Sequence, residues 1–374
     1  MPTNNPRQWK GGWQARYRDP DGNQRSKSFA RKVDAVRFLA ATETAKMQGE
    51  WVDPALGRTR LDDWAWRWLG TVWPTLKPST AMTYESLLWA RILPVLGARP
   101  LASLRPSDVQ GWIGEMVGEG LSASRTRQAH VVLSRVLDAA VADGFIARNA
   151  TSSTRLPRLE RREAGYFEPA VVDRIADAMG GADGLLVRIL GTLGLRWGEA
   201  AALTRASVDL VHRRLRVQGS ASEVGGQVIA GSTKAHATRS VPLPRSLADA
   251  LAGHLEERVG RGAAAPLFTG PRGGPLRHSA FYGRRWRPTL AELGLPMVGL
   301  HVLRHSAAAR LISAGASPKA VQTVLGHASA AFSLTVYGHL FDADLDALAD
   351  ALDGPAAKAD VVPMWSRSAE VTGE

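Results

Sequence analysis

Apolar and polar residues alternate near the start of the chain. Between Trp9 and Phe29, the residues Trp13, Ala15 and Tyr17 would lie on one side of an extended strand, before Asp19-Pro20-Asp21-Gly22-Asn23 reverses the chain. We therefore expect a β-hairpin. A helix should follow from about Arg31 to Gln48, where apolar residues recur at helical spacing at Val33, Val36, Leu39 and Ala40.

The predicted hairpin carries basic residues on alternate positions, namely Arg16, Arg18, Arg25 and Lys27. This pattern predicts one basic face, while Trp13, Tyr17 and Phe29 pack on the helix. Such a ribbon fits the major groove of DNA, but a solvated edge ribbon would show the same charges. Charge alone gives the two interpretations equal weight.

A second block, from about Leu61 to Asn149, contains only helix signals, enough for four or five helices. We expect Ser79 to cap a helix after Pro78, Ser107-Asp108 to open another after Pro106, and Ser122 to start the longest one, which Gly144 ends. Tryptophans at helical spacing should lie mostly in the core; they are Trp64, Trp68, Trp89 and Trp112.

Basic residues gather near the start of the longest predicted helix, where Arg125 and Arg127 stand beside Ser124 and His130. Backbone donors and basic side chains at a helix start could hold a phosphate, and a solvated face is the alternative. The next stretch, Thr151 to Gly165, has no apolar period and predicts a basic linker. We expect its arginines to lie along a phosphate backbone, although a merely soluble tether would look alike; they are Arg155, Arg158, Arg161 and Arg162.

A third block, about Tyr166 to Leu352, mixes helices with short strands between Arg214 and Leu243. The expected fold is multidomain and mainly α, with an α+β third domain. It comprises a small β-hairpin and helix domain (1–57), an all-helical domain (58–150), the linker (151–165), a mixed, mostly helical domain (166–354) and a flexible tail (355–374).

Composition narrows the function. The 374 residues suffice for two or three domains, and 47 Lys and Arg against 35 Asp and Glu leave a net charge of +12, which favours a polyanion such as nucleic acid as partner. The absence of cysteine excludes disulfides, Cys-based metal sites and a thiol nucleophile. Met1 to Lys10 lacks the apolar core of a signal peptide, and the most apolar stretch, Leu185 to Leu195, is too short to cross a bilayer. We expect a cytoplasmic protein without a membrane span.

Four short motifs in the third block could carry chemistry. Arg196 follows a glycine break with Glu199 three positions later, and Lys234 lies in a predicted hairpin whose second strand ends at Val241 to Pro244. His301 and Arg304 stand one helical turn apart and face the same way. Finally, His327 follows Leu325-Gly326, and Tyr337 comes ten positions later. Each motif alone is ordinary, but their order is specific.

Two histidines four positions apart, His301 and His305, could bind zinc on one helix face. The metalloprotease motif requires a glutamate directly after the first histidine, and Val302 stands there instead. We therefore expect no metal site and no other cofactor.

In this order, the motifs resemble those of tyrosine recombinases of the phage integrase family, most strongly from about Leu193 to Leu340. The resemblance implies that Arg196 and Arg304 clamp the scissile phosphate and that Lys234 is the general acid. It further implies that His301 and His327 are the active-site histidines, that Glu199 supports the first arginine and that Tyr337 is the nucleophile.

The same resemblance implies an N-terminal arm-site reader, a helical core-site binder and a catalytic domain that act on double-stranded DNA at attachment-type sites. A homotetramer on DNA is expected, with accessory directionality or DNA-bending proteins as further partners. The extra hairpin domain favours an integrase of a temperate phage or another mobile element. An acidic stretch with Leu345, Leu348 and Leu352 at helical spacing either packs on its own domain or, as the resemblance suggests, docks on a neighbouring protomer.

The chemistry of phosphodiester cleavage supports the same roles for these residues independently of the resemblance. Attack on a phosphodiester adds charge to the non-bridging oxygens, and the planar, always charged arginine side chain suits that charge. Tyrosine has a pKa of about 10, so its proton must be accepted or shared; His301 or His327 could do so while Lys234 protonates the leaving 5′ oxygen. Of the five tyrosines, Tyr282 beside Arg284 and Arg285 is the rival of Tyr337, and we assign it to packing or a phosphate contact.

Three other functions compete with this interpretation. A type IB topoisomerase would use the same chemistry to relax DNA at undefined sites. A non-catalytic DNA-binding regulator would tolerate Tyr337→Phe, and a metallohydrolase would lose its activity in chelator.

Overall fold

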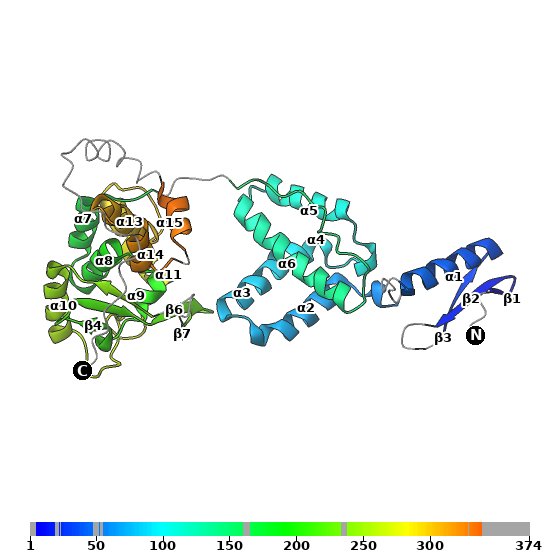
Figure 1. Cartoon of the computed structure of the whole chain (residues 1–374), viewed down its shortest axis with the longest axis horizontal. Helices are drawn as coiled ribbons and strands as arrows, with labels where there is room; N and C mark the ends of the chain where they lie inside the picture. The colour runs from blue at the N-terminus through cyan, green and yellow to red at the C-terminus, as the bar shows by residue number, and fades with distance from the viewer. Residues whose placement is uncertain are drawn as a thin grey trace, which may run out of the picture. The chain divides into compact units, whose positions relative to one another are not determined.

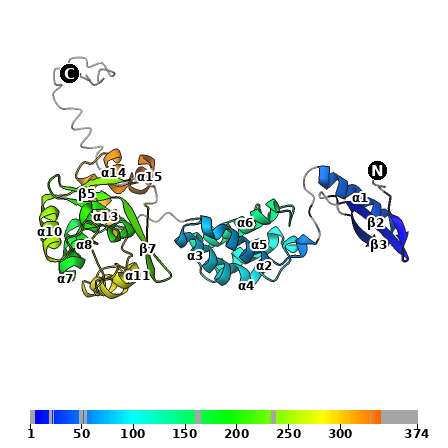
Figure 2. The same cartoon turned by 90° about the horizontal axis from the view of Figure 1, so that it is seen from below.

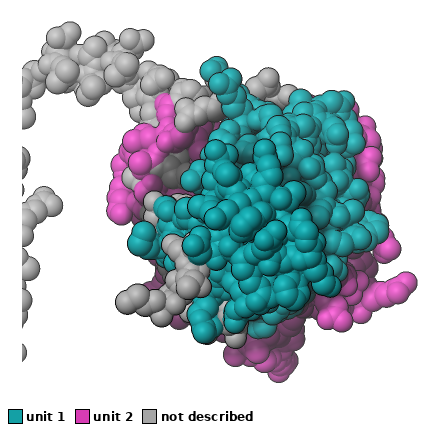
Figure 3. All heavy atoms as spheres, turned by 90° about the vertical axis from the view of Figure 1, so that its right-hand side faces the viewer, with its two compact units in different colours: residues 1–161 teal, residues 162–374 magenta. Residues whose placement is uncertain are grey.

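The computed structural model describes residues 5–18, 22, 24–47, 52, 55–159, 165–232, 238–327 and 329–338. The chain is mostly helical with small antiparallel sheets and forms two compact units, Met1–Arg161 and Arg162–Glu374 (Figures 1 and 3). In the described residues, no helix is long and apolar enough to cross a membrane.

The first unit begins with a three-stranded antiparallel sheet in the order β1 (Arg7–Trp9), β2 (Gly12–Arg18) and β3 (Gln24–Phe29), followed by α1 (Lys32–Met47). The predicted hairpin is β2 and β3, and the predicted helix is α1; β1 was not predicted. Ala15 and Tyr17 of the sheet are buried against Ala35 and Leu39 of the helix.

Two expectations for this sheet are wrong. Val33 and Val36 of α1 are exposed, because the helix turns the face with Ala35 and Leu39 towards the sheet. The predicted single basic face is also absent. Arg25 pairs with Tyr17 across the strands and Lys27 pairs with Ala15, and directly paired residues project from the same side of a sheet. Arg25 and Lys27 therefore share the face that α1 covers, whereas Arg16 and Arg18 lie on the opposite face.

The helical part of the first unit comprises α2 (Leu61–Val72), α3 (Pro78–Leu87), a π-helical turn (Leu88–Ile92), α4 (Leu93–Leu96), α5 (Pro106–Gly118) and α6 (Ala123–Ala142), with short 3₁₀ turns at Leu56–Arg58, Trp73–Thr75 and Leu101–Ser103. The π turn immediately precedes Leu93-Pro94, where proline lacks the N–H that would continue α-helical bonding. Trp64, Trp68 and Trp112 are buried as expected, while Trp89 on the π turn is 73% exposed.

The helix boundaries follow local capping chemistry. Ser122 caps α6 as predicted, since its Oγ accepts the N–H of Arg125 at 3.3 Å, and Gly144 follows the helix with a φ of +73°. Ser79 does not cap α3; the helix already begins at Pro78, whose fixed φ suits the first helical position. Pro106 likewise begins α5 one residue earlier than expected.

Residues 151–159, in the expected linker, bond to the helical part of the first unit. Arg127 Nε donates to the carbonyl of Pro157 at 2.8 Å, and the ring of His130 lies 2.7 Å from the hydroxyl of Thr154. The side-chain amide of Gln110 bonds both backbone polar groups of Arg155. These contacts order the segment, while Arg155 and Arg158 remain exposed; Arg161 and Arg162 lie outside the described residues.

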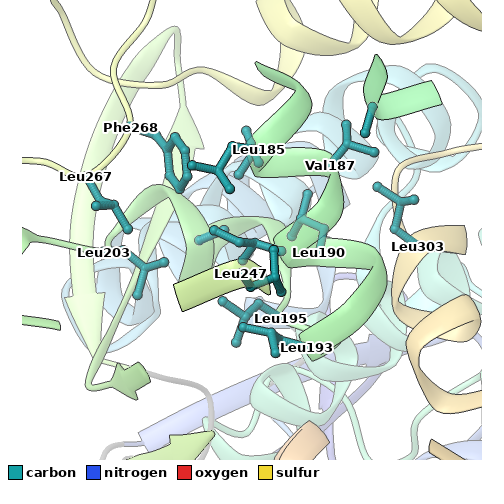
Figure 4. Packing of buried hydrophobic residues seen from close by; sticks show 14 of the residues in the cluster. Leu185, Val187, Leu190, Leu193, Leu195, Leu203, Leu247, Leu267, Phe268 and Leu303 are labelled. Carbon is teal, nitrogen blue, oxygen red and sulfur yellow. The ribbon is translucent and has the colours of Figure 1, made fainter. Parts of the chain in front are cut away.

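The second unit is built around α8 (Gly181–Leu193). Figure 4 shows Leu185, Leu190 and Leu193 of this helix packed with Leu247 of α10 (Arg245–Glu257) and Leu303 of α13 (Val302–Ser313). The remaining helices are α7 (Pro169–Met179), α9 (Trp197–Ala201), α11 (His278–Phe281), α12 (Arg287–Glu292), α14 (Pro318–Leu325) and α15 (Ala330–Tyr337), with a 3₁₀ turn at Arg205–Ser207 and a π turn at Tyr282–Trp286. The apolar core thus holds α13 beside α8, next to the loop that carries Arg196.

The strands of the second unit form two separate sheets. Strands β4 (Val208–Asp209), β5 (Arg214–Val217) and β8 (Arg239–Pro242) form one, and β6 (Gly219–Val224) pairs with β7 (Gln227–Ser232) in the other. The strands on either side of residues 233–237 therefore pair with different neighbours, so the predicted hairpin around Lys234 is wrong. Lys234 itself lies outside the described residues.

Candidate active site

Arg196 stands at the N-cap position of α9, just after the break that ends α8. Gly194 makes this break in the left-handed region, with a φ of +67°, and a Cβ there would come within 2.2 Å of Leu325. One oxygen of Glu199 accepts the backbone N–H of Arg196 at 2.9 Å, and the other accepts its Nη1 at 2.9 Å. A capping interaction thus fixes the guanidinium next to the helix start.

Glu199 is the hub of the arginine cluster, and its side chain is 2% exposed. Both carboxylate oxygens accept bonds from Arg239 of β8, at 2.9 and 2.7 Å. Burial opposes ionisation of Glu199, but the bonds from Arg239 and Arg196 hold its pKa below the ordinary value of 4.5. Sequence reasoning missed Arg239, whose only signal was a basic residue on a predicted strand.

Arg304 is buried on α13, with 2% of its surface exposed. Its Nη1 donates to the carbonyl of Gly194 at 2.7 Å, which ties the two arginine-bearing segments together. Its Nη2 is buried and has no hydrogen-bond partner among the described residues. Burial and the charge of Arg196 lower the pKa of Arg304 to about 10, so the side chain stays charged near neutral pH. An unpartnered, charged donor of this kind is suited to an anionic acceptor from outside the protein.

Among the described residues, the charges at this site do not balance. Arg196 and Arg239 both act on Arg304, and Glu199 is the carboxylate that bonds Arg196 and Arg239. The arginine excess is positioned by protein carbonyls and one carboxylate rather than neutralised. This arrangement can hold the negative charge that develops on a phosphoryl group under attack.

His327 follows α14 at a second left-handed glycine, Gly326, with a φ of +68°. The carbonyl of Gly326 accepts Nη2 of Arg196 at 3.3 Å, which links this loop to the arginine cluster. His327 Nδ1 lies 2.7 Å from the hydroxyl of Ser333. Burial, reinforced by Arg304 and other nearby cations, lowers the pKa of His327 to about 4, so the ring is neutral at pH 7.

Tyr337, the last residue of α15, is 3% exposed. Figures 1 and 2 show α13, α14 and α15 close together, and the tyrosine shares an apolar cluster with Ala308 of α13 and with Val321 and Leu325 of α14. Its hydroxyl lies 2.8 Å from Nδ1 of His305. Burial raises the pKa of Tyr337 above 10, although Arg304 acts in the opposite direction.

His305 is the second residue that the sequence analysis left without a role. It was considered only as half of a zinc pair with His301. The two rings do lie side by side, with centroids 5.0 Å apart and planes at 87°, and His301 is exposed at the start of α13. The rings of His305 and Tyr337 meet at 5.7 Å, so His305 contacts both a predicted site histidine and the predicted nucleophile.

The β6–β7 hairpin is fastened next to the arginine cluster. Gly198 of α9 packs so closely on it that a Cβ would lie 2.5 Å from the carbonyl oxygen of Ala221. Glu223 of β6 accepts the backbone N–H and the hydroxyl of Ser279, at 2.9 and 2.6 Å, which joins the hairpin to the start of α11. The chain leaves β7 at Ser232, two residues before Lys234.

The structure therefore gathers Arg196, Glu199, Arg304, His327 and Tyr337 in one cluster, with His301 beside His305. The rival tyrosine, Tyr282, stacks on His278 with a centroid distance of 6.0 Å and packs against the apolar core, which agrees with the packing alternative. The basic residues proposed for DNA binding lie on the first unit: Arg16, Arg18, Arg25, Lys27, Arg125, Arg127, Arg155 and Arg158.

Comparison with known proteins relates the chain to DNA-processing enzymes. Residues 166–344 match the family model described as "Phage integrase family", and residues 60–117 match "Phage integrase, N-terminal SAM-like domain". The chain is 29% identical over 335 residues to the integrase of Mycobacterium phage D29, which covers 86% of this chain and 88% of the relative. It is 30% identical over 290 residues to the tyrosine recombinase XerC of Chromohalobacter salexigens, covering 74% of this chain and 89% of the relative.

Solved structures share the fold. The integrase of transposon Tn1549, in complex with a circular intermediate DNA, superposes with a TM-score of 0.67 at 22% identity and covers 78% of this chain and 99% of its own. A lambda integrase dimer bound to a core site superposes with a TM-score of 0.59 at 20% identity and covers 97% of this chain and 99% of its own.

Proposed function

The chain belongs to the phage integrase family of tyrosine recombinases, and we propose that it is a site-specific DNA recombinase that integrates or excises a mobile element. The observation that carries this proposal is the buried Tyr337 beside a cluster that, in the described part of the chain, holds more arginines than carboxylates and leaves Nη2 of Arg304 available to an external anion. The phage D29 relative and the other integrases support the mobile-element role.

The proposed reaction exchanges one phosphoester for another. The Oη of Tyr337 attacks the scissile phosphorus and forms an Oη–P bond, while the bond from phosphorus to the 5′ oxygen breaks. The DNA keeps a 3′ phosphate, now esterified to the tyrosine, and the 5′ oxygen leaves with a proton. Attack by a 5′ hydroxyl from a partner strand reverses the step. Because one ester replaces another, neither ATP nor a metal is required.

Arg196 and Arg304 are proposed to bind the non-bridging oxygens of this phosphate. If each resembles an oxyanion-hole donor, its loss would slow cleavage about 10²–10³-fold. Glu199 and Arg239 would hold Arg196 rather than contact the DNA, since their charged groups bond each other. His327, neutral at pH 7, and the exposed His301 are the proposed histidine contacts to the reacting groups.

Lys234 is the proposed general acid for the 5′ oxygen. A sulfur in place of that bridging oxygen leaves without protonation, because a thiolate is far more stable than an alkoxide. Lys234→Ala should therefore cleave ordinary DNA slowly and sulfur-substituted DNA at the wild-type rate. An equal defect on both substrates would contradict the general-acid role while leaving the recombinase assignment intact.

The first unit is proposed to bind DNA through its exposed basic side chains. The N-terminal sheet with Arg16 and Arg18 would read arm-type sites, and the helical part with Arg125 would bind the core site. Arg155 and Arg158, held near the helices by the contacts of their segment, would follow the phosphate backbone, as would Arg161 and Arg162. Arg127 would act indirectly, because its Nε holds the carbonyl of Pro157.

Assembly on DNA is the remaining part of the proposal. A lambda integrase tetramer bound to a Holliday junction has the same fold, which supports a homotetramer here. The second unit has a groove of about 390 Å³ whose lining includes the apolar residues Val241, Leu243 and Leu311 and the basic residues Arg213, Arg214 and Arg310. The acidic, leucine-bearing segment around Leu345 to Leu352 has the complementary character, so we propose that it docks in this groove on a neighbouring protomer. Accessory proteins remain a further prediction.

One experiment separates this function from its alternatives. A plasmid with two attachment sites, taken from DNA beside the gene, is incubated with the protein with and without chelator, and a plasmid without sites serves as control. Recombination of the two-site plasmid, with no change in the site-free plasmid, supports the proposal. Relaxation of the site-free plasmid would indicate a topoisomerase, binding without any strand exchange would indicate a regulator, and loss of activity in chelator alone would indicate a metallohydrolase.

A further inference from the structure

We propose that His305 accepts the proton of the Tyr337 hydroxyl during strand cleavage, a role that rests on the proposed recombinase function. Nδ1 of His305 lies 2.8 Å from the tyrosine oxygen, within the range from which a general base removes a proton. This contact assigns the proton to a residue other than His301 or His327, the two histidines favoured by the sequence.

An apolar cluster around Tyr337 and a ring contact to His305 set the geometry of this pair. Tyr337 is fixed in a small apolar cluster with Ala308, Val321 and Leu325, so its hydroxyl has a defined position. Ala308 lies one helical turn after His305 on α13 and leaves room for the tyrosine ring. On the other side, the ring of His301 meets that of His305 edge-on at 5.0 Å. Both the donor and the acceptor are therefore held before DNA binds.

The charges around the pair favour a neutral imidazole and a protonated phenol in the resting protein. Arg304 of α13 and His301 at its N-cap are the neighbours of His305 along the chain, and His327, from the loop before α15, faces the ring of Tyr337. Burial and the charge of Arg304 keep the pKa of His305 below 6.5, and burial raises that of Tyr337. With its proton on Nε2, the neutral ring accepts the Oη–H hydrogen bond through Nδ1.

His327 makes different contacts from those of His305. Its Nδ1 lies 2.7 Å from the hydroxyl of Ser333, and its ring is nearly parallel to that of Tyr337, with planes at 17° and centroids 6.2 Å apart. The ring of His305 instead meets that of Tyr337 at 61°, and its Nδ1 lies at hydrogen-bond distance from the hydroxyl. His305 thus contacts the nucleophile through a ring nitrogen, whereas Nδ1 of His327 bonds to Ser333 of α15.

The step balances without a co-reactant. As Oη forms its bond to phosphorus, its proton moves to Nδ1 of His305, and the 5′ oxygen that leaves takes a proton from Lys234. During rejoining, the incoming 5′ hydroxyl gives its proton back to Lys234, and His305 returns a proton to Oη as the tyrosine leaves. One histidine therefore acts as base in cleavage and as acid in rejoining.

The test measures single-turnover formation of the covalent protein–DNA complex on a nicked duplex, using the full chain. His305→Asn places a hydrogen-bonding amide near the position of Nδ1 but cannot take up a proton. We expect its rate to fall about 10²–10⁴-fold, the usual contribution of a general base, with unchanged DNA affinity. The matched control is His212→Asn, which changes an exposed histidine paired with Asp209 and should cleave at the wild-type rate.

A second measurement distinguishes proton transfer from packing. Fluorinated tyrosine at position 337 is more acidic and needs less help from a base, so it should recover at least about tenfold of the rate lost in His305→Asn and gain much less in the wild-type background. A wild-type rate in His305→Asn, or equal effects of fluorination in both backgrounds, would overturn the role of His305 while the recombinase assignment stands. DNA binding without covalent linkage by the wild type would overturn both.

Discussion

Arg239 stabilises the buried, ionised side chain of Glu199, because a buried carboxylate is tolerated only when it is paired and hydrogen-bonded. Arg239→Ala removes two of its hydrogen bonds and leaves Arg196 as its partner. We expect the free energy of unfolding to fall by about 3–5 kcal/mol in chemical denaturation. Cleavage should slow as well, since Glu199 also orients Arg196.

The matched control for this change is Arg216→Ala. Arg216 pairs with Asp209 at 3.2 Å, but its side chain is 55% exposed. Solvent-exposed pairs contribute little, so this variant should stay within about 0.5 kcal/mol of the wild type. Equal losses in the two variants would contradict the central position given to Glu199.

His327 predicts a pH dependence of stability. Its pKa is about 4 in the folded chain, below the ordinary value of 6.5, so the unfolded chain binds more protons between these values. Stability contributed by neutral His327 is therefore present above about pH 6.5 and is lost as the pH falls towards about 4. Between about pH 7 and about pH 5, the wild type should lose about 2 kcal/mol more than His327→Asn. Parallel losses in chemical denaturation would contradict this environment for His327.

Among the elements, the contact between α9 and the β6–β7 hairpin is the most sensitive to added volume. Gly198→Ala would bring a Cβ to 2.5 Å from the Ala221 carbonyl and 2.6 Å from the Ser220 hydroxyl. We expect it to push the hairpin away from α9 and to slow covalent complex formation at least about tenfold, as misplaced catalytic groups do.

Gly253→Ala is the control for this substitution. Gly253 lies within α10, and no atom would lie within 4 Å of a new Cβ. This variant should cleave normally and gain up to about 1 kcal/mol of stability, because alanine favours a helix over glycine. Normal cleavage by Gly198→Ala would show that the hairpin does not depend on this contact.

Elements whose signals are local could be predicted from the sequence. The cap at Ser122, the end of α6 at Gly144 and the burial of Trp64 and Trp112 all follow from neighbouring residues. The face of α1 could not, because helical spacing offered Val33 and Val36 as readily as Ala35, and only the register of the sheet decides between them.

Arg239 and His305 were missed because contacts between segments far apart in the sequence bring them to the site. Arg239 reaches Glu199 because β8 pairs with β5 across an inserted hairpin, a pairing that alternation along the strand does not reveal. His305 reaches Tyr337 because α15 packs on α14, which in turn packs on α13. The order of the motifs was sufficient to predict that Arg196, Arg304 and His327 lie in one site. Their resemblance to a family carries long-range information that spacing along the chain lacks.

At the scale of the whole molecule, the net charge of +12 predicts binding that depends steeply on salt. Each phosphate neutralised contributes about −0.9 to the slope of log affinity against log salt. Arg125→Ala should reduce this slope by about one unit if Arg125 contacts a phosphate. An unchanged slope in titrations by fluorescence anisotropy would remove Arg125 from the interface, and a flat dependence in the wild type would contradict DNA binding driven by charge.

The central claim is that Tyr337 attacks DNA, and covalent trapping tests it most directly. Nicked duplexes from DNA beside the gene are incubated in chelator with the wild type and with Tyr337→Phe, then separated on a denaturing gel. We predict a slow, protease-sensitive DNA band for the wild type and none for Tyr337→Phe, with equal DNA binding by both proteins. A covalent band that persists in Tyr337→Phe, or its absence from wild-type protein bound to the same DNA, would contradict the account.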